Sequence, residues 1–228
     1  MPVTLHVWRV PRRRIGAAFL RMARDPRRLR SLPGVRFAKL LGTGTGDTFG
    51  PGDADLTRYA ALVVRDGTGD IGDIGDGWDR IAESSARVDL TPVHSHGTWS
   101  GQTPFVPTGE KPDGMVLAVT RARLRPVRAL TFWNAVPPVV RELHAAPGLL
   151  ARFGMGEAPI GWQGTVSVWR SATDLTAFAY RQPQHRAVIA RTQAGGWYAE
   201  DLFARFAVRD IIGDRSVLGW RQGGQAQR

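Results

Sequence analysis

The alternation of apolar and polar residues predicts a β-strand at the start of each half of the chain. In Val3–Val10 and again in Met115–Leu124, residues i, i+2 and i+4 fall on one side, as in a half-buried strand. Apolar residues then recur at helical spacing, which predicts an amphipathic helix after each strand. These residues are Ile15, Phe19, Met22 and Leu29 in the first half, and Leu130, Trp133, Val136, Val140 and Leu143 in the second. Pro26 and Pro137-Pro138 are expected to end or kink those helices.

Both halves continue with the same series of elements. After a Pro-Gly turn, each predicts a second strand, a glycine-rich connection, a third strand, a second helix and a fourth strand. The third strands are Tyr59–Val64 and Thr165–Trp169, the second helices Trp78–Ser85 and Thr173–Thr192, and the fourth strands Arg87–His94 and Phe203–Ile212. Asp66–Gly77 is interpreted as a flexible surface loop rather than a calcium loop, because it lacks the bidentate glutamate at its final position.

A shift of 114 residues brings the two halves into register. It places Pro33-Gly34 on Pro147-Gly148 and Gly42 on Gly156. The order βαββαβ is that of a ferredoxin-like unit, and two such units can pack sheet to sheet. We therefore predict an α+β fold, with two ferredoxin-like βαββαβ units packed as a dimeric-type α+β barrel. The predicted boundaries are 1–98 for the first unit, 99–114 for a linker, 115–214 for the second unit and 215–228 for a flexible tail.

The composition excludes several kinds of chemistry. The 228 residues include no cysteine, which rules out a disulfide scaffold, thiolate catalysis, iron–sulfur clusters and thiolate-ligated haem. Only five histidines are present, so any metal or haem has to rely on one or two imidazoles. No apolar run approaches the ~20 residues of a membrane-spanning helix. With 43% hydrophobic and 22% charged residues, the chain is expected to be a globular, cytoplasmic protein.

The chain is strongly basic, with 31 lysines and arginines against 20 acidic residues and a net charge of +11. The clearest basic cluster extends from Arg12 to Arg30. It is typical of a solvated helix face, and it also suits peripheral contact with an anionic membrane. Nucleic acid is not expected as a partner, because no recognised nucleic-acid-binding motif is present.

Four features suggest chemistry. Gly42–Gly46 is interpreted as a strand end that lines a pocket, since no Lys-Ser/Thr follows it to complete a phosphate loop. His94 and His96 point the same way on a strand, yet no third metal ligand is evident nearby. His185 follows Pro183 on the apolar face of a predicted helical turn, as either a neutral imidazole ligand or a structural residue. The eight tryptophans belong mostly to the core, but they also suit a large planar or polyene ligand.

Six spaced segments carry a resemblance to a known family. They are Phe37–Gly46, Gly97–Phe105, Ala118–Ala122, Phe153–Pro159, Val166–Trp169 and Gly196–Phe206. Through them the chain resembles the spheroidene monooxygenase family of carotenoid biosynthesis over nearly its whole length. Asp66–Gly77 and His94-Ser95-His96 are not features of that pattern, which leaves the substrate open.

The resemblance implies a haem-dependent monooxygenase that oxidises an acyclic carotenoid, or a similar apolar substrate, with dioxygen and electrons from a ferredoxin-type donor. The implied cofactor is haem b, bound to the second unit, with His185 as the axial iron ligand. Arg205 and Trp197 would also contact the haem. The remaining candidates are Ser100 and Gln163 as catalytic residues, and Trp99, Phe105, Gly42 and Thr43 as the lining of the substrate pocket.

Three other functions fit the same predicted fold. One is a cofactor-free oxygenase of the antibiotic-biosynthesis monooxygenase type, which needs only substrate and dioxygen. Another is a non-catalytic carrier of haem or of a small apolar ligand. The third is a haem-dependent dehydratase of the aldoxime type. An absorption spectrum of protein made with ample haem precursor separates the cofactor-free reading from the others.

Overall fold

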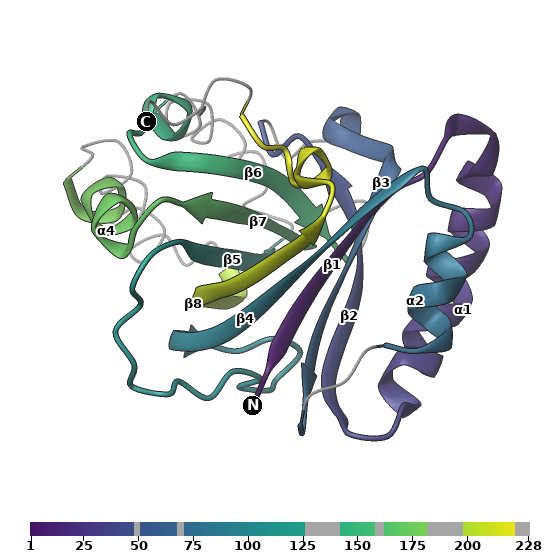
Figure 1. Ribbon diagram of the computed structural model, residues 1–228, viewed down its shortest axis with the longest axis horizontal. Coiled ribbons are helices and arrows are strands. Elements are labelled where there is room, and N and C mark those ends of the chain that lie inside the picture. Colours follow the sequence, from purple (N-terminus) through teal and green to yellow (C-terminus); the bar gives the residue numbers. More distant parts are fainter. Residues whose placement is uncertain (48–50, 68–70, 126–141, 158–161, 182–197, 222–228) are drawn as a thin grey trace.

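The computed structural model of the protein describes residues 1–47, 51–67, 71–125, 142–157, 162–181 and 198–221. Eight antiparallel strands form a closed barrel in the order β1-β3-β2-β6-β7-β5-β8-β4 (Figure 1). The strands are β1 Val3–Arg9, β2 Val35–Gly44, β3 Ala54–Arg65, β4 Ser84–Gly97, β5 Val116–Leu124, β6 Leu149–Gly156, β7 Trp162–Trp169 and β8 Tyr198–Gly213. The helices are α1 Ile15–Ser31, α2 Asp73–Asp79 and α4 Ala172–Arg181, with short 3-10 turns at Arg12–Arg14, Pro51–Asp53 and Arg215–Leu218.

The barrel consists of two four-stranded sheets with the same internal order. The first half contributes β4-β1-β3-β2, and the second contributes β8-β5-β7-β6. Two seams join the halves. One contains the pair Gly42 and Gly156, the other the pair Pro92 and Phe206, and both pairs join residues 114 positions apart. The seams therefore lie where a two-fold relation between the repeats requires them, which confirms the predicted α+β barrel of two ferredoxin-like units.

Glycines allow close contact at the β2–β6 seam. Gly46 has φ +77°, and a Cβ atom there would lie 2.9 Å from the backbone nitrogen of Gly154. A Cβ atom on Gly154 would in turn lie 2.8 Å from the Cα of Gly46. Arg152 on β6 crosses the same seam, donating to the Gly46 carbonyl at 3.1 Å and pairing with Asp47. The glycine-rich segment that ends β2 is thus a contact between the two halves.

Apolar side chains fill the inside of the barrel, while the helices lie against its outer wall. The interior core draws on every strand, with Leu5, Leu62 and Leu117 among its buried members. Helices α1 and α2 cover the outer face of the first sheet, and α4 lies against the outer face of the second (Figure 1). Ligands of any size are therefore expected outside the wall, between a sheet and the segments that cover it.

The structure corrects the prediction for the second helix of the first half. This helix was expected at Trp78–Ser85, after a loop at Asp66–Gly77, but α2 occupies Asp73–Asp79 and β4 already begins at Ser84. Ile74 and Trp78, four residues apart, are both buried on one face of α2. Asp73 and Asp76 lie in its first turn, where carboxylates interact favourably with the helix dipole.

Of the two outcomes expected at Pro26, an end or a kink, the end is wrong, because α1 continues through it to Ser31. The proline removes one intrahelical hydrogen bond. Ala18 and Leu29, buried on either side of it, pack both parts of the helix against the first sheet. That packing holds the helix together.

Parts of the predicted linker and of the predicted flexible tail are packed into the barrel. Trp99 and Phe105, in the predicted linker 99–114, are buried in the interior core. Val217 and Leu218, in the predicted tail 215–228, are buried in the same core from the turn Arg215–Leu218. The second helix predicted at Thr173–Thr192 is described only as α4, and the part of the tail from 222 onward lies outside the described residues.

Candidate functional site on the second sheet

The outer face of the first sheet is filled by aromatic side chains. Trp8 on β1 stacks on Trp78 of α2, with ring centroids 5.3 Å apart, and Tyr59 on β3 lies 5.1 Å from the same ring. The Trp8 indole N–H donates to Asp79 at 2.8 Å. His6 stacks on Trp8 from the next outward position of β1. Helices and sheet thus form a solid apolar layer on this half.

The matching face of the second sheet has much smaller side chains at its centre. Ala118, Thr120 and Ala122 alternate along the outward side of β5, with Thr165 and Ser167 beside them on β7. Ala118, Ala122 and Ser167 are each less than a tenth exposed. We call these five residues the small-residue floor.

The two-fold relation shows what the second sheet lacks. Leu5 pairs with Leu62 in the first half as Val119 pairs with Val166 in the second, so Trp8 and Tyr59 correspond to Ala122 and Gln163. By the same relation His6 corresponds to Thr120. The stacked aromatic rings that occupy the first half thus have no counterpart on β5. Space for a flat apolar molecule is expected above the small-residue floor.

Helix α4 covers only one end of this face. Trp169, Leu175 and Phe178 form a buried cluster with Val116, at the start of β5. The rings of Trp169 and Phe178 lie 5.3 Å apart, and the Trp169 indole N–H donates to the Ser167 hydroxyl at 2.9 Å. The cluster forms a wall over one end of the small-residue floor, since Ala118 is one of its members, and Ala122 lies outside it.

Two of the residues predicted from the sequence belong to this face. Position 163 on β7 pairs with Ala122 on β5. Arg205 on β8 pairs with Ala118 and lies at the edge of the floor. His185 and Trp197 lie outside the described residues, in the stretch between α4 and β8.

The predicted pocket residues Trp99 and Phe105 lie on the inner side of the sheet, inside the barrel. The Phe37 ring contacts Trp99 edge-on at 5.5 Å and Phe105 at 6.3 Å. Phe105 also meets Phe206 at 4.9 Å, and Trp99 is completely buried. These aromatic residues pack as barrel core, separated by the sheet from the small-residue floor.

A buried ionic network lies next to Trp99. Arg121 on β5, only 2% exposed, pairs with Glu200 of β8 and with Glu157 after β6, where Nη2 and Oε1 are 3.1 Å apart. The Trp99 indole N–H donates to Glu157 at 2.6 Å, and Lys39 of β2 donates to the other oxygen of Glu157 at the same distance. Its members come from five of the six segments that carry the family resemblance. We call it the Arg121 network.

Glu200 is held as a carboxylate by this network. Burial alone raises its pKa, but hydrogen bonds from the backbone N–H of Gly101 and from Arg121, with the charge of Arg121, lower the pKa to about 2. Ser100, the predicted catalytic hydroxyl, accepts a hydrogen bond from Lys39 at 2.6 Å. Its φ of +55° is unusual for a residue other than glycine, and the next amide, of Gly101, points at Glu200. The described contacts of Ser100 thus join it to the Arg121 network.

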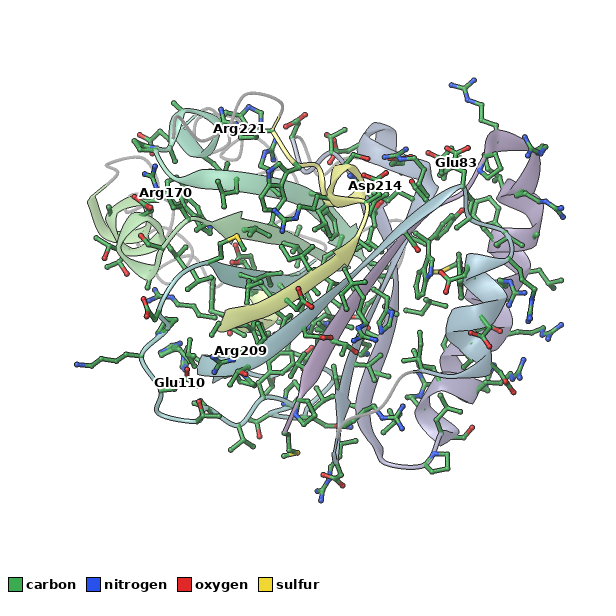
Figure 2. All side chains as sticks on the ribbon, viewed as in Figure 1. Glu83, Glu110, Arg170, Arg209, Asp214 and Arg221 are labelled. Atoms are coloured by element: carbon green, nitrogen blue, oxygen red, sulfur yellow. The ribbon has the colours of Figure 1, made fainter. Side chains whose placement is uncertain are left out.

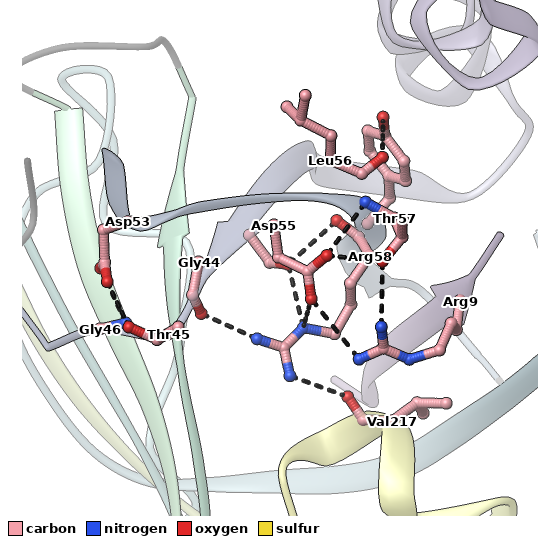
Figure 3. A network of polar contacts seen from close by, with 12 residues as sticks. Arg9, Gly44, Thr45, Gly46, Asp53, Asp55, Leu56, Thr57, Arg58 and Val217 are labelled. Carbon is pink, nitrogen blue, oxygen red and sulfur yellow. Dashed lines mark hydrogen bonds and ion pairs between the residues drawn. The ribbon is translucent and has the colours of Figure 1, made fainter. Parts of the chain in front are cut away.

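Thr43 belongs to a separate network, which is centred on Arg58 (Figure 3). The buried Arg58 donates to the Thr43 hydroxyl at 3.0 Å, to the Gly44 carbonyl at 2.8 Å and to the Val217 carbonyl at 3.4 Å. Burial lowers the pKa of Arg58 to about 10, so it remains a cation at neutral pH. Gly42 pairs with Gly156 at the seam. These contacts connect β2 and β3 to the turn after β8.

The histidine pair does not form a metal site with its described neighbours. His94 and His96 pair with Arg205 and Phe203 on β8, and both are exposed on the outer face of β4, so they point the same way as predicted. Within the described ranges, no three histidine, aspartate or glutamate side chains are grouped closely enough to hold a metal ion. Nor is any helix of those ranges both long and apolar enough to cross a membrane.

Sequence reasoning missed the small-residue floor and the Arg121 network. The floor was present in the alternation of Ala118, Thr120 and Ala122, but small residues on a predicted strand give no signal until the repeat is compared position by position. The network could not be found because its residues are far apart in the chain. Only the barrel brings Lys39, Arg121 and Glu200 together.

Comparison with known proteins places the chain in a family. No family model matches it. It is 33% identical over 189 residues to the spheroidene monooxygenase of Rhodobacter capsulatus, covering 79% of this chain and 78% of that protein. It is also 33% identical over 186 residues to the spheroidene monooxygenase of Rubrivivax gelatinosus, covering 79% of this chain and 72% of that protein.

Solved structures agree with the fold. Two crystal structures of aldoxime dehydratases superpose with TM-scores of 0.54 and 0.56, at 12% and 13% identity. Each covers 96% of this chain, and the matches cover 86% and 84% of those proteins. At such low identity they support the architecture alone. The identity to the two sequence relatives shows that the chain belongs to the spheroidene monooxygenase family.

Proposed function

We propose that this protein is a haem-dependent monooxygenase that oxidises an acyclic carotenoid or a similar apolar polyene on the outer face of its second sheet. The observation that carries the proposal is the small-residue floor. It lies where the first half holds Trp8 and Tyr59, and a flat apolar molecule can take the place of those rings. The carotenoid class comes from the relatives, which are named as spheroidene monooxygenases.

The residues present suit haem b. Ala122, which lies outside the cluster on α4, offers a small apolar contact to a macrocycle, and Arg205 at the edge of the floor is suited to pair with a propionate. Since the chain has no cysteine, a thiolate cannot hold the iron, and we assign this role to the imidazole of His185. We place Trp197 against the same group. When bound, haem supplies the activation of dioxygen.

The chain's own contribution is to position the substrate and exclude water. The wall formed by Trp169 and Phe178 closes one end of the floor and keeps the face apolar. Gln163, which pairs with Ala122, is a candidate for a polar contact with the oxidised end of the substrate. The Arg121 network fixes β5 to its neighbours from behind, since Arg121 follows Thr120 on the opposite side of the strand. Electrons would come from a ferredoxin-type donor.

The test is turnover by the haem-loaded protein. Purified protein with a Soret band is incubated with spheroidene, a reduced ferredoxin and isotopically labelled dioxygen. The masses of the products are then determined by mass spectrometry. We expect a product that has gained labelled oxygen. A haem protein that leaves the polyene unchanged would overturn the proposed reaction and favour a carrier. Oxygenation by protein without a Soret band would favour the cofactor-free mechanism.

The axial ligand is tested separately. His185→Ala is expected to lose the Soret band while its circular dichroism is unchanged. His94→Ala is the matched control, because His94 is exposed on β4 and should keep haem. An unchanged Soret band in His185→Ala would show that another residue holds the iron.

A further inference from the structure

The outer face of α1 has an apolar stripe that points away from the protein. Gly16, Phe19, Leu20 and Ala23 are all exposed, and their spacing of three, four and seven residues places them on one side of the helix. Phe19 is 50% and Leu20 59% exposed. The other side of the helix, with Ala18 and Leu29, already packs on the first sheet. The helix is therefore apolar on two opposite sides, and only one of them is covered within the described structure.

Arginines surround this stripe. Arg24 and Arg27 follow Leu20 by four and seven residues, so they continue the same side of the helix. The exposed arginines of the segment are Arg12, Arg13, Arg14, Arg24, Arg27, Arg28 and Arg30. Asp25 is its single acidic residue, and it is buried beside Arg21 at 3.4 Å. The face is thus strongly positive as well as apolar.

The combination favours a lipid surface over other anionic partners. A nucleic acid gains from the arginines but has no use for an exposed phenylalanine and leucine at the centre of the patch. A ferredoxin-type donor would have to reach the second half, whereas α1 lies on the side of the molecule opposite α4 (Figure 1). An anionic bilayer meets both features, because apolar side chains enter the interface while arginines contact lipid phosphates.

We propose that the outer face of α1 is a docking surface for anionic membranes, with Phe19 and Leu20 inserted at the interface and the surrounding arginines paired with headgroups. The observations come from α1 and its surroundings, and only the argument against a ferredoxin-type donor rests on the proposed function. It also orients the protein, with the second sheet facing away from the docked helix.

The test compares two triple variants of equal charge. Arg24→Gln, Arg27→Gln and Arg28→Gln are combined in one. Arg170→Gln, Arg209→Gln and Arg221→Gln, all exposed and remote from α1 (Figure 2), are combined in the control. Binding is measured by sedimentation with vesicles of phosphatidylcholine containing phosphatidylglycerol, and with phosphatidylcholine alone. We expect the α1 variant to bind anionic vesicles at least tenfold more weakly and the control within about threefold of the parent, since one arginine near the surface contributes about fivefold.

Insertion has its own readout. Because the chain has no cysteine, Leu20→Cys and the control Leu56→Cys, also exposed, each accept a single environment-sensitive fluorophore. Only the label at position 20 is expected to shift to the blue when anionic vesicles are added, and Phe19→Ser with Leu20→Ser should weaken binding. The proposal is overturned if both triple variants lose affinity equally, if the label at position 20 does not respond, or if excess duplex DNA releases the protein completely.

Discussion

Arg121 is the residue whose removal should affect stability most. Replacing it with glutamine leaves Glu157 and Glu200 facing each other in the barrel without their shared cation. Breaking a buried ion pair on one side costs about 3–5 kcal/mol. We expect Arg121→Gln to lower the free energy of unfolding by about 3 kcal/mol in a denaturant titration.

The matched control is Arg36→Gln. Arg36 pairs with Asp66 at 2.7 Å, but both side chains are at least half exposed, so the loss should stay below about 1 kcal/mol. Equal losses in the two variants would mean that the Arg121 network contributes no more than a surface ion pair.

Glu200 gives the network a pH dependence. Its pKa falls from 4.5 in the unfolded chain to about 2 in the folded protein, so its contribution to stability is complete above pH 4.5 and is lost as the pH falls toward 2. Glu200→Gln should remove that part of the pH dependence. The measurement is the free energy of unfolding between pH 6 and pH 3 for parent and variant. Parallel curves would contradict the assignment.

At the residue scale, the sequence predicted types of site better than their locations. The resemblance drew attention to Trp99 and Ser100, and both belong to a polar and aromatic cluster, but that cluster is inside the barrel. Alternation along a predicted strand indicates which residues share a face of the sheet. It does not indicate which face lies inside the barrel. Without the register between β5 and β8, the side on which Arg205 lies could not be derived.

Among the elements, the β2–β6 seam depends on the absence of a side chain at Gly154. An alanine Cβ would lie 2.8 Å from the Cα of Gly46, so one strand has to move. We expect Gly154→Ala to destabilise the protein by about 1–3 kcal/mol, as for overpacking of a core. Thermal unfolding should show a clear drop in Tm. Gly52→Ala, where nothing lies within 4 Å, should leave Tm unchanged or raise it slightly, because alanine lowers the conformational entropy of the unfolded chain. A similar drop there would contradict the steric explanation.

The strands were predicted from the sequence more accurately than the helices. Residue alternation located β1 and β5 to within a residue at each end, because half-buried strands repeat every two positions. Helix α2 was displaced because its glycines and aspartates are typical of loops. Its position is set by Ile74 and Trp78, which pack on β1 and β3, a long-range contact that local sequence does not reveal.

For the molecule as a whole, one substitution should give the outer face of the second sheet the large aromatic side chain that the first sheet has. Ala122→Trp introduces at the small-residue floor the side chain that Trp8 provides in the first half. We expect the variant to fold, to lose the Soret band and to lose turnover of the polyene. Absorbance and activity of the haem-reconstituted protein check this. Val106→Trp, at a position 54% exposed, adds the same side chain elsewhere and should keep both. Retention of haem by Ala122→Trp would place the cofactor away from the floor.

The duplication allowed the overall fold to be predicted, because both halves repeat the order βαββαβ. The pairing of like strands at the two seams is a finding of the structure. The functional difference between the halves could not be predicted in the same way. It depends on which outward-facing positions carry large side chains and which carry small ones. These positions can be compared only when the cross-strand partners of Trp8 and Ala122 are known.

The packed interior of the barrel has a consequence for substrate choice. Aromatic and aliphatic side chains occupy the lumen, with the Arg121 network and Arg58 toward its two ends. A polyene bound as we propose therefore cannot thread through the barrel and would lie along the outer face of the second sheet. An enzyme with the proposed site would select the carbon that it oxidises by the distance of that carbon from the bound end of the polyene. Molecules with the same near end should react at the same carbon, whatever their total length.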